Sequence, residues 1–539
     1  MDCSWISPAD LPGTNRLYST YLSDFSRVTD FYIHPPNAGG IDESIRDVRV
    51  DDSVRRAVVD VLASQNRAFG GDESTVRNLD RLREGAVAVV TGQQVGLFGG
   101  PAYSIYKALT AVHVARELTE RGVSAVPVFW LATEDHDLAE VNHCFVPKRG
   151  GFERFDLAVS GQDDRRVGDI RLGEPIREIS KQLTALLAGP CAEKVGQWNE
   201  ECYAPEETFG SAFGKLMTRI FACRGLIFLD PMSLELHRLS LPVMRRAVKE
   251  HAALAADLVA RSEALEKAGF HAQVKVTAQS TLVFRIVDGR RLAIRPTNGG
   301  LAAGDRTESL DETLRALEEH PEDFSPSALL RPVVQDTLLP TVAYIAGAAE
   351  AAYHAQTSLL YKKLLGRAPA ILPRAGFTIV PQHVANLLKK YDLDAREVLQ
   401  GRHKLRACLE AEALPQELSA RFDEGERAIQ SAVDGLREPL AKLDQTLIGA
   451  LETASEKMLY QFTGLRAKAG RAEGFRTGVL NTHENEIAGA LFPENVLQER
   501  SFGLLTFLAS EGPELLDELD RHVRTSGEHC LLFLPPAAR

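Results

Sequence analysis

The sequence has few cysteines, and they are not arranged as in a disulfide framework or a zinc ribbon. Its 539 residues contain seven cysteines, scattered along the chain without a Cys-x-x-Cys pair. It also lacks an apolar run of the roughly 20 residues that cross a bilayer. The first residues carry neither the basic nor the apolar segment of a secretory signal. These absences favour a cytoplasmic location, reduced thiols and no membrane span.

The sequence also has no excess of basic residues. Lys and Arg number 62 and Asp and Glu number 74, so the net charge is −12 at pH 7. This balance argues against nucleic acid or an anionic membrane as a partner, although it permits a local basic pocket. The composition, 44% hydrophobic and 25% charged, is otherwise that of a globular protein. At this length we expect one large divided domain or two to four smaller ones.

The first clear pattern is a strand, a glycine-rich loop, a helix and a second strand. Residues 86–90 and 125–131 are continuous apolar runs, which are typical of strands buried on both faces. Between them, residues 91–101 contain four glycines, and residues 102–121 carry apolar side chains at helical spacing. This order is a βαβ unit, so the sequence predicts an α/β fold with a parallel sheet.

Two stretches interrupt this core. The first has charge clusters and weak periodicity, and the second alternates like antiparallel strands around the turn Asp288-Gly289. We interpret both as insertions. The predicted division is a core of residues 1–150, 206–245 and 331–383, insertions at 151–205 and 246–330, a helical coiled-coil domain at 384–470 and a C-terminal segment at 471–539.

The predicted helical domain has an apolar seam. Apolar residues recur every seven positions from Phe422 to Leu443, with a second apolar series beside them. Pro439 lies inside this run and should kink the helix or divide it in two. Two arrangements fit the pattern, namely a helical hairpin packed on its own domain and a coiled coil that associates with a second copy.

The glycine-rich loop is the first candidate site. Backbone N–H groups of such a loop at a helix N-terminus can bind phosphate, because glycine permits close approach and the helix dipole favours negative charge. Lys107, one and a half turns into the helix, could add a positive charge. The spacing matches neither a Walker loop nor Gly-x-Gly-x-x-Gly, and the glycines could instead serve packing alone. The candidate nucleotide- or substrate-binding residues are Thr91, Gly92, Gln93, Gln94, Gly100 and Tyr103.

A second candidate site follows the second strand, where open parallel sheets bind their ligands. Carboxylates beside an imidazole can orient the ring for proton transfer, or they can bind a metal. Acidic runs are also often solvated loops. Because this segment and the glycine loop should meet at the same end of the sheet, we favour a functional role. The residues are Glu134, Asp135, His136, Asp137, Asn142 and His143.

A third candidate lies between residues 344 and 356. Glu350 and His354 are spaced i,i+4, and Tyr353 is their neighbour, so all three could reach a cleft from one helical turn. The small residues around them argue equally for close helix packing.

These motifs together resemble the family of bacillithiol biosynthesis cysteine-adding enzymes. The main matching segments are Thr91-Gly92-Gln93-Gln94-Val95-Gly96-Leu97 with Gly100-Pro101, and Glu134-Asp135-His136-Asp137 through Asn142-His143. Supporting segments are Leu372-Pro373-Arg374, Gln498-Glu499-Arg500 and Gly512-Pro513-Glu514. The chain departs from the family at Gly347-Ala348-Ala349-Glu350, where relatives usually have Gly-Pro-Gly-Glu.

The resemblance implies a Rossmann-like core with connecting insertions and a C-terminal α-helical coiled coil that forms a homodimer. It also implies a ligase that joins L-cysteine to glucosaminyl malate through an amide bond, giving bacillithiol. ATP, an adenine nucleotide, is the expected cofactor, because a carboxylate does not acylate an amine without activation. Lys107 would then stabilise phosphate or carboxylate charge, and His136 beside Asp135 would handle a proton or hold the substrate amine. Both side chains should lie in a solvent-accessible cleft.

Two other functions fit the residues alone. A metal-dependent hydrolase could use Asp135, His136, Asp137 and His143, although the helical His-x-x-x-His pattern of many zinc sites is lacking. A non-catalytic scaffold could recruit partners through the coiled coil, but two polar clusters at one end of a sheet would then have no role. We assign no metal site.

Overall fold

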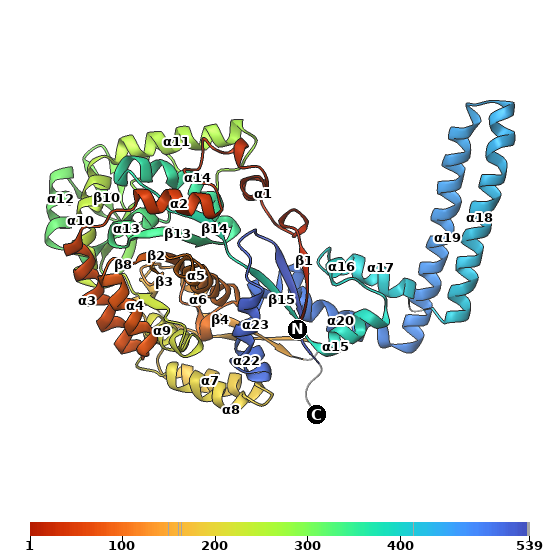
Figure 1. Cartoon of the computed structure of the whole chain (residues 1–539), viewed down its shortest axis with the longest axis horizontal. Helices are drawn as coiled ribbons and strands as arrows, with labels where there is room; N and C mark the ends of the chain where they lie inside the picture. The colour runs from red at the N-terminus through yellow and green to blue at the C-terminus, as the bar shows by residue number, and fades with distance from the viewer. Residues whose placement is uncertain (149, 160, 163, 413, 536–539) are drawn as a thin grey trace.

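The computed structural model describes residues 1–535 except 149, 160, 163 and 413 (Figure 1). A five-stranded sheet of parallel strands lies at its centre, in the order β14-β13-β2-β3-β6. The strands are β2 (Val87–Gln93), β3 (Ala125–Leu131), β6 (Ile227–Leu229), β13 (Thr341–Ala346) and β14 (Ala370–Pro373). Numbered by chain order, they run 3-2-1-4-5 across the sheet, which is the order of a Rossmann fold. The predicted Rossmann-like parallel core is confirmed.

Both faces of this sheet are covered by helices. One face packs on α2 (Ala38–Asp47), α5 (Tyr103–Glu120) and α9 (Phe209–Ile220), and the other on α1 (Arg16–Ser23), α3 (Asp52–Phe69), α4 (Glu73–Arg83) and α14 (Ala348–Leu360). Successive strand residues point to opposite faces, so Val89 meets α5 while Val90 meets α3. Because each strand is buried on both sides, its apolar run is continuous.

The strand limits correct one expectation. β3 has the predicted limits, but β2 continues through Thr91, Gly92 and Gln93, which were predicted to belong to the glycine loop. Gly92 pairs with Trp130 of β3. A Cβ atom at Gly92 would lie 3.0 Å from the Trp130 carbonyl oxygen, so glycine permits the close approach of these two strands.

The segments that interrupt the sheet form small subdomains. The first contains α6 (Leu138–Val141), the antiparallel pair β4 (His143–Lys148) and β5 (Gly151–Asp156), α7 (Pro175–Leu186) and α8 (Ala192–Cys202). The second contains α10 (Leu234–Lys249), α11 (His251–Lys267), β7 (Val283–Val287), β8 (Arg290–Ala293), β9 (Arg295–Thr297), β10 (Gly300–Ala303), β11 (Arg306–Glu308), α12 (Leu310–Glu319), β12 (Phe324–Pro326) and α13 (Arg331–Leu338). The predicted hairpin at Asp288-Gly289 is confirmed, because β7 and β8 pair around these two residues, both of which have positive φ.

The two ends of the chain meet in a second sheet. Its strands are β1 (Asp2–Ile6), β16 (His529–Phe533) and β15 (Gly376–Val380), with β16 in the centre. The helices of the C-terminal part are α15 (Gln382–Lys390), α16 (Ala395–Val398), α17 (Arg402–Glu412), α18 (Gln416–Leu443), α19 (Leu447–Thr477), α20 (Val479–Leu491), α21 (Gln498–Ser501), α22 (Leu505–Glu511) and α23 (Leu515–Arg521). Within the described ranges, no helix has both the length and the apolar character of a membrane span.

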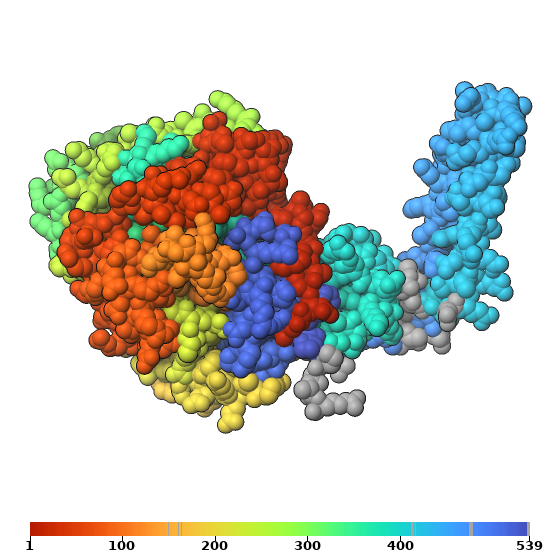
Figure 2. All heavy atoms as spheres, viewed as in Figure 1, coloured from red at the N-terminus to blue at the C-terminus, as the bar shows by residue number. Residues whose placement is uncertain are grey.

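Helices α18 and α19 form a long hairpin that stands clear of the body (Figures 1 and 2). Phe422 packs on Phe462 at a ring distance of 5.4 Å, so the apolar seam is used within one chain, as the hairpin interpretation predicts. Pro439 lies inside α18 and does not divide it, because the chain turns only after Leu443. Leu443 is nevertheless 77% exposed, so part of the seam remains uncovered in the single chain.

Candidate functional site

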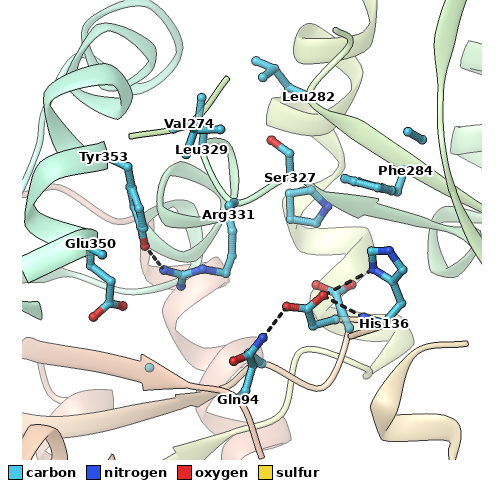
Figure 3. Close-up of a pocket in the computed structure, with 18 of the residues that line it drawn as sticks. Gln94, His136, Val274, Leu282, Phe284, Ser327, Leu329, Arg331, Glu350 and Tyr353 are labelled. Atoms are coloured by element: carbon cyan, nitrogen blue, oxygen red, sulfur yellow. Dashed lines mark hydrogen bonds and ion pairs between the residues drawn. The ribbon is translucent and has the colours of Figure 1, made fainter. Parts of the chain in front are cut away.

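A cavity of about 900 Å³ opens at the carboxyl ends of β2, β3 and β13 (Figure 3). Its walls come from these strand ends, from α5 and α14, and from residues 274–295 and 326–331, which belong to or follow the second insertion. The order of the strands reverses between β2 and β13, and open α/β sheets bind ligands at such a switch point. The fold therefore places the principal cavity where ligand binding is expected.

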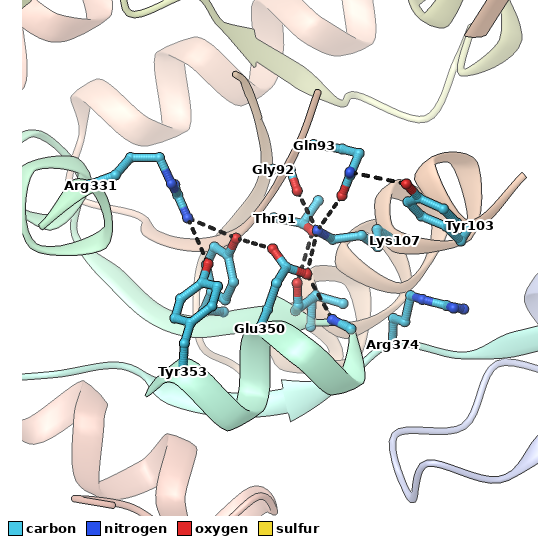
Figure 4. Close-up of polar contacts among 12 residues, drawn as sticks. Thr91, Gly92, Gln93, Tyr103, Lys107, Arg331, Glu350, Tyr353 and Arg374 are labelled. Carbon is cyan, nitrogen blue, oxygen red and sulfur yellow. Dashed lines mark hydrogen bonds and ion pairs between the residues drawn. The ribbon is translucent and has the colours of Figure 1, made fainter. Parts of the chain in front are cut away.

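A buried ion pair lies at the switch point (Figure 4). Lys107 Nζ of α5 is 2.6 Å from Glu350 Oε2 of α14 and 3.1 Å from Gln93 Oε1 of β2. It also donates to the carbonyl oxygen of Gly92. One ammonium group thus connects the end of β2 with the helix that follows β13.

Glu350 has a second role, at the start of α14. Its Oε2 accepts a hydrogen bond from the backbone N–H of Gly347, the N-cap residue, at 2.8 Å. Its Oε1 accepts from the hydroxyl of Tyr344 at 2.9 Å. A carboxylate in the first turn also stabilises the helix dipole. The two alanines after Gly347 are the first helical residues, so the departure from Gly-Pro-Gly-Glu preserves the position of Glu350.

Both members of this ion pair have pKa values below their ordinary values. Burial lowers the pKa of Lys107, and Glu350 offsets only part of this effect. Burial acts to raise the pKa of Glu350, but the charge of Lys107 and the hydrogen bonds from Lys107 and Gly347 outweigh it, so the pKa lies below its ordinary value. Lys107 is only 1% exposed. Lys107 lines the cavity, as expected, but it is almost completely buried and its charge is paired with Glu350.

Asp135 and His136 do reach the cavity, and both contact Arg291 of β8. Arg291 Nη1 lies 3.0 Å from His136 Nδ1 and 3.7 Å from Asp135 Oδ1. Burial acts to raise the pKa of Asp135, but hydrogen bonds from His136 and Gln94 and the charge of Arg291 hold it well below its ordinary value. A guanidinium can only donate, so Arg291 is the donor in its contact with His136 Nδ1.

Glu134 precedes this pair and is almost completely enclosed. It is 7% exposed and lines the cavity from the floor formed by β3. Burial raises its pKa to about 7, although Arg291 and Arg166 act in the opposite direction. A carboxyl group with this pKa can gain or lose a proton near neutral pH.

The remainder of the glycine loop does not form the predicted phosphate cradle. The backbone N–H of Gly99 donates to the hydroxyl of Tyr203 at 2.9 Å, and that of Ala102, at the start of α5, donates to the carbonyl of Phe502 at 2.7 Å. Gly100 is buried and does not line the cavity. The glycines here serve close packing, since a Cβ atom on Gly96 would lie 2.8 Å from Gly100 Cα.

The candidate residues fall into two groups. Those that line the cavity are Gly92, Gln93, Gln94, Tyr103, Lys107, Glu134, Asp135, His136 and Glu350. Those that lie outside it are Thr91, Gly100, Asp137, Asn142, His143 and His354. Thr91 donates to the carbonyl of Ile345 in β13, and burial lowers the pKa of His354 to about 3, where the ring stacks on Tyr353. For these two residues the structure supports packing roles.

The prediction from sequence missed most of the basic residues of the cavity. The cationic side chains that line it are Lys107, Lys275, Arg291, Arg295, Arg331, Arg374 and Arg500, and the acidic ones are Glu134, Asp135, Glu140 and Glu350. Arg331 donates to the hydroxyl of Tyr344 at 3.1 Å and lies 5.9 Å above the ring of Trp130. The cavity is thus net positive in a protein whose net charge is −12. Arg374 and Arg500 belong to the supporting motif segments, so part of this set was visible in the sequence.

The geometry does not favour the metal-dependent hydrolase. Over the described residues, no group of three or more His, Cys, Asp or Glu side chains is placed to share an ion. Asp137 and His143 lie outside the cavity, while Asp135 and His136 contact Arg291, whose positive charge would repel a cation.

Replacing Lys107 with alanine should destabilise the fold, because Glu350 would lose its counter-ion. Removing one partner of a buried ion pair costs about 3–5 kcal/mol, and we expect the lower part of this range. The reason is that Glu350 keeps 21% of its side chain exposed. Urea unfolding should show this loss, and the Lys107→Met/Glu350→Gln double variant should recover part of it.

The matched control is Lys442→Ala, which removes an exposed pair with Glu438. Its free energy of unfolding should change by less than about 0.5 kcal/mol. Equal stability of Lys107→Ala and the wild type would contradict the structural role of the pair.

Comparisons with known proteins agree with this architecture. Residues 1–375 match the family described as "Bacillithiol biosynthesis BshC, N-terminal Rossmann-like domain", and residues 377–534 match its C-terminal coiled-coil domain. A protein of Koribacter versatilis named "Putative cysteine ligase BshC" is 42% identical over 98% of this chain and 99% of its own length. Proteins of the same name from Solibacter usitatus and Salinibacter ruber are 37% and 33% identical, each over 96% of both chains. The chain belongs to the bacillithiol biosynthesis BshC family.

Proposed function

We propose that this protein is a ligase that joins L-cysteine to glucosaminyl malate through an amide bond and so forms bacillithiol. ATP activates the cysteine carboxylate, because an ionised carboxylate does not acylate an amine. The observation that carries the proposal is the net positive cavity at the switch point of a Rossmann sheet. Its family relatives are named as cysteine ligases, which supports the same reaction class.

The charge of the cavity fits these substrates. The phosphates of ATP, the two carboxylates of the malate group and the carboxylate of cysteine are all anionic, so their approach is favoured by a cationic lining. Arg331 and Arg500 line the cavity and form no ion pair with a carboxylate among the described residues, so no acidic partner neutralises their positive charges. Guanidinium forks match phosphate and carboxylate oxygens in pairs. A volume of about 900 Å³ lies at the upper end of the range of small-molecule sites, as two substrates require.

The function can be tested in cells and with the pure protein. A strain that lacks this gene should accumulate glucosaminyl malate and lose bacillithiol. Purified protein should form bacillithiol from cysteine, glucosaminyl malate and ATP. The Arg331→Gln variant should be slower by about 100-fold or more, because it loses a cation that faces developing negative charge.

The Arg238→Gln variant is the control, because Arg238 is an exposed residue of α10 outside the cavity. It should retain the wild-type rate. Normal bacillithiol in the deletion strain, without accumulation of the precursor, would refute the proposed function.

We also propose that the protein is a cytoplasmic homodimer that associates through the α18–α19 hairpin. Several large apolar side chains are exposed on this hairpin, namely Leu418, Leu436, Leu443, Met458, Tyr460 and Leu465. A monomer would keep this surface in water at a cost in free energy. Pairing of two hairpins would remove it from water.

Light scattering should therefore give the mass of a dimer at micromolar concentration. The Leu443→Glu/Tyr460→Glu double variant should shift the protein towards a monomer, because charges replace apolar contacts. Val76→Glu, which changes an apolar residue of α4 that is 53% exposed, should leave the mass unchanged. A wild-type protein that is monomeric throughout this range would reject the proposal.

A further inference from the structure

Glu134 differs from the other acidic residues of the cavity in its contacts. Asp135 accepts a hydrogen bond from Gln94 at 3.0 Å, Glu140 accepts one from Gln94, and Glu350 accepts from Lys107. Glu134 Oε1 has no hydrogen-bond partner among the residues that the structure describes. This oxygen is buried on the side of His237, while the residue as a whole lines the cavity.

The nearest basic candidate does not neutralise this group. His237 of α10 places Nε2 at 3.5 Å from Glu134 Oε1, which is too far for a good hydrogen bond. Burial lowers the pKa of His237 to about 4, so the ring is neutral at physiological pH. His237 Nε2 is itself without a hydrogen-bond partner in the described part of the chain. Behind Glu134 there is thus a neutral ring and no counter-ion.

The arginines that surround Glu134 are used elsewhere. Arg291 donates to Ser325, to the carbonyl of Pro326 and to His136. Arg331 donates to the hydroxyls of Tyr344 and Tyr353 and to Gln335. Their charges act on Glu134 from a distance, but their hydrogen-bond donors point to other acceptors.

We propose that Glu134 binds the primary ammonium group of a substrate, which donates to its carboxylate from the cavity. This inference rests on the proposed function, in which two substrates carry such a group. Cysteine carries an α-ammonium group, and glucosaminyl malate carries an ammonium group on its sugar. Either group supplies the positive charge and the N–H donors that this carboxylate lacks.

The other ligands of the reaction are less suitable at this position. Phosphate and carboxylate groups carry the same charge as Glu134 and are repelled by it. They are attracted instead to the cationic side chains of the cavity, which include Arg331 and Arg500. The cavity thus separates a cationic part, which suits anions, from one unpartnered carboxylate, which suits an ammonium group.

The inference can be tested by binding measurements that do not require turnover. Isothermal titration calorimetry should measure the affinity of the full-length wild type and of Glu134→Gln for L-cysteine and for glucosaminyl malate separately. The substitution keeps the shape of the side chain and removes its charge. The dissociation constant of one substrate should rise by about 10- to 100-fold, because a hydrogen bond between charged groups is lost.

Analogues that lack the amino group show which of the two substrates donates to Glu134. 3-Mercaptopropionate is cysteine without its amino group, and N-acetylglucosaminyl malate has no ammonium. The analogue of the affected substrate should bind the wild type and Glu134→Gln with equal affinity, because the interaction with residue 134 is already absent. Glu235→Gln makes the same change at an exposed glutamate of α10 and should bind both substrates as the wild type does.

Thermal unfolding separates binding from folding. Glu134→Gln should unfold at the same temperature as the wild type or higher, because it removes an unpaired buried carboxylate. Equal affinity of the wild type and Glu134→Gln for both substrates would overturn the inference, and so would a lower unfolding temperature together with weaker binding of both amine-free analogues. A wild type that binds neither substrate would instead refute the proposed function.

Discussion

The ion pair between Lys107 and Glu350 is the contact on which the geometry of the cavity depends. It joins α5, the end of β2 and the first turn of α14 at the point where the strand order reverses. Such a pair is tolerated in a buried position because Gln93, Gly347 and Tyr344 satisfy the remaining donors and acceptors. Its role is therefore to fix the cavity floor, and the charges that face a ligand come from other residues.

The walls of the cavity come from segments far apart in the chain. The second insertion contributes Arg291, which holds Asp135 and His136 in position. The C-terminal segment is attached to the core through Arg374, which forms an ion pair with the buried Glu499 and lies over the ring of Tyr103. It also covers the N-terminus of α5 through the carbonyl of Phe502. Because Phe502 occupies this N–H group at the start of α5, it is not free to contact a ligand.

Local patterns in the sequence predicted the fold well, because strand burial and helical spacing are properties of neighbouring residues. The limits of β3, the hairpin at Asp288-Gly289 and the coiled-coil hairpin followed from such patterns. The burial of Lys107 could not be predicted, since its partner Glu350 lies 243 residues away. The contact of Arg291 with His136 spans 155 residues, and no local signal announces it. The packing role of Gly99 and Gly100 was likewise not decided by the sequence, because the groups that contact this part of the loop, Tyr203 and Phe502, lie far along the chain.

Contacts with distant segments also give the adjacent residues Glu134, Asp135 and His136 different surroundings. Asp135 accepts a hydrogen bond from Gln94 and lies near Arg291, and His136 also contacts Arg291, so both are engaged by protein groups. Glu134 Oε1 has no such partner among the described residues, because the segment turns its carboxylate away from these donors and towards the neutral ring of His237. A burial cost of this kind persists only where something offsets it, and under the proposed function a cationic substrate group would do so in the bound state.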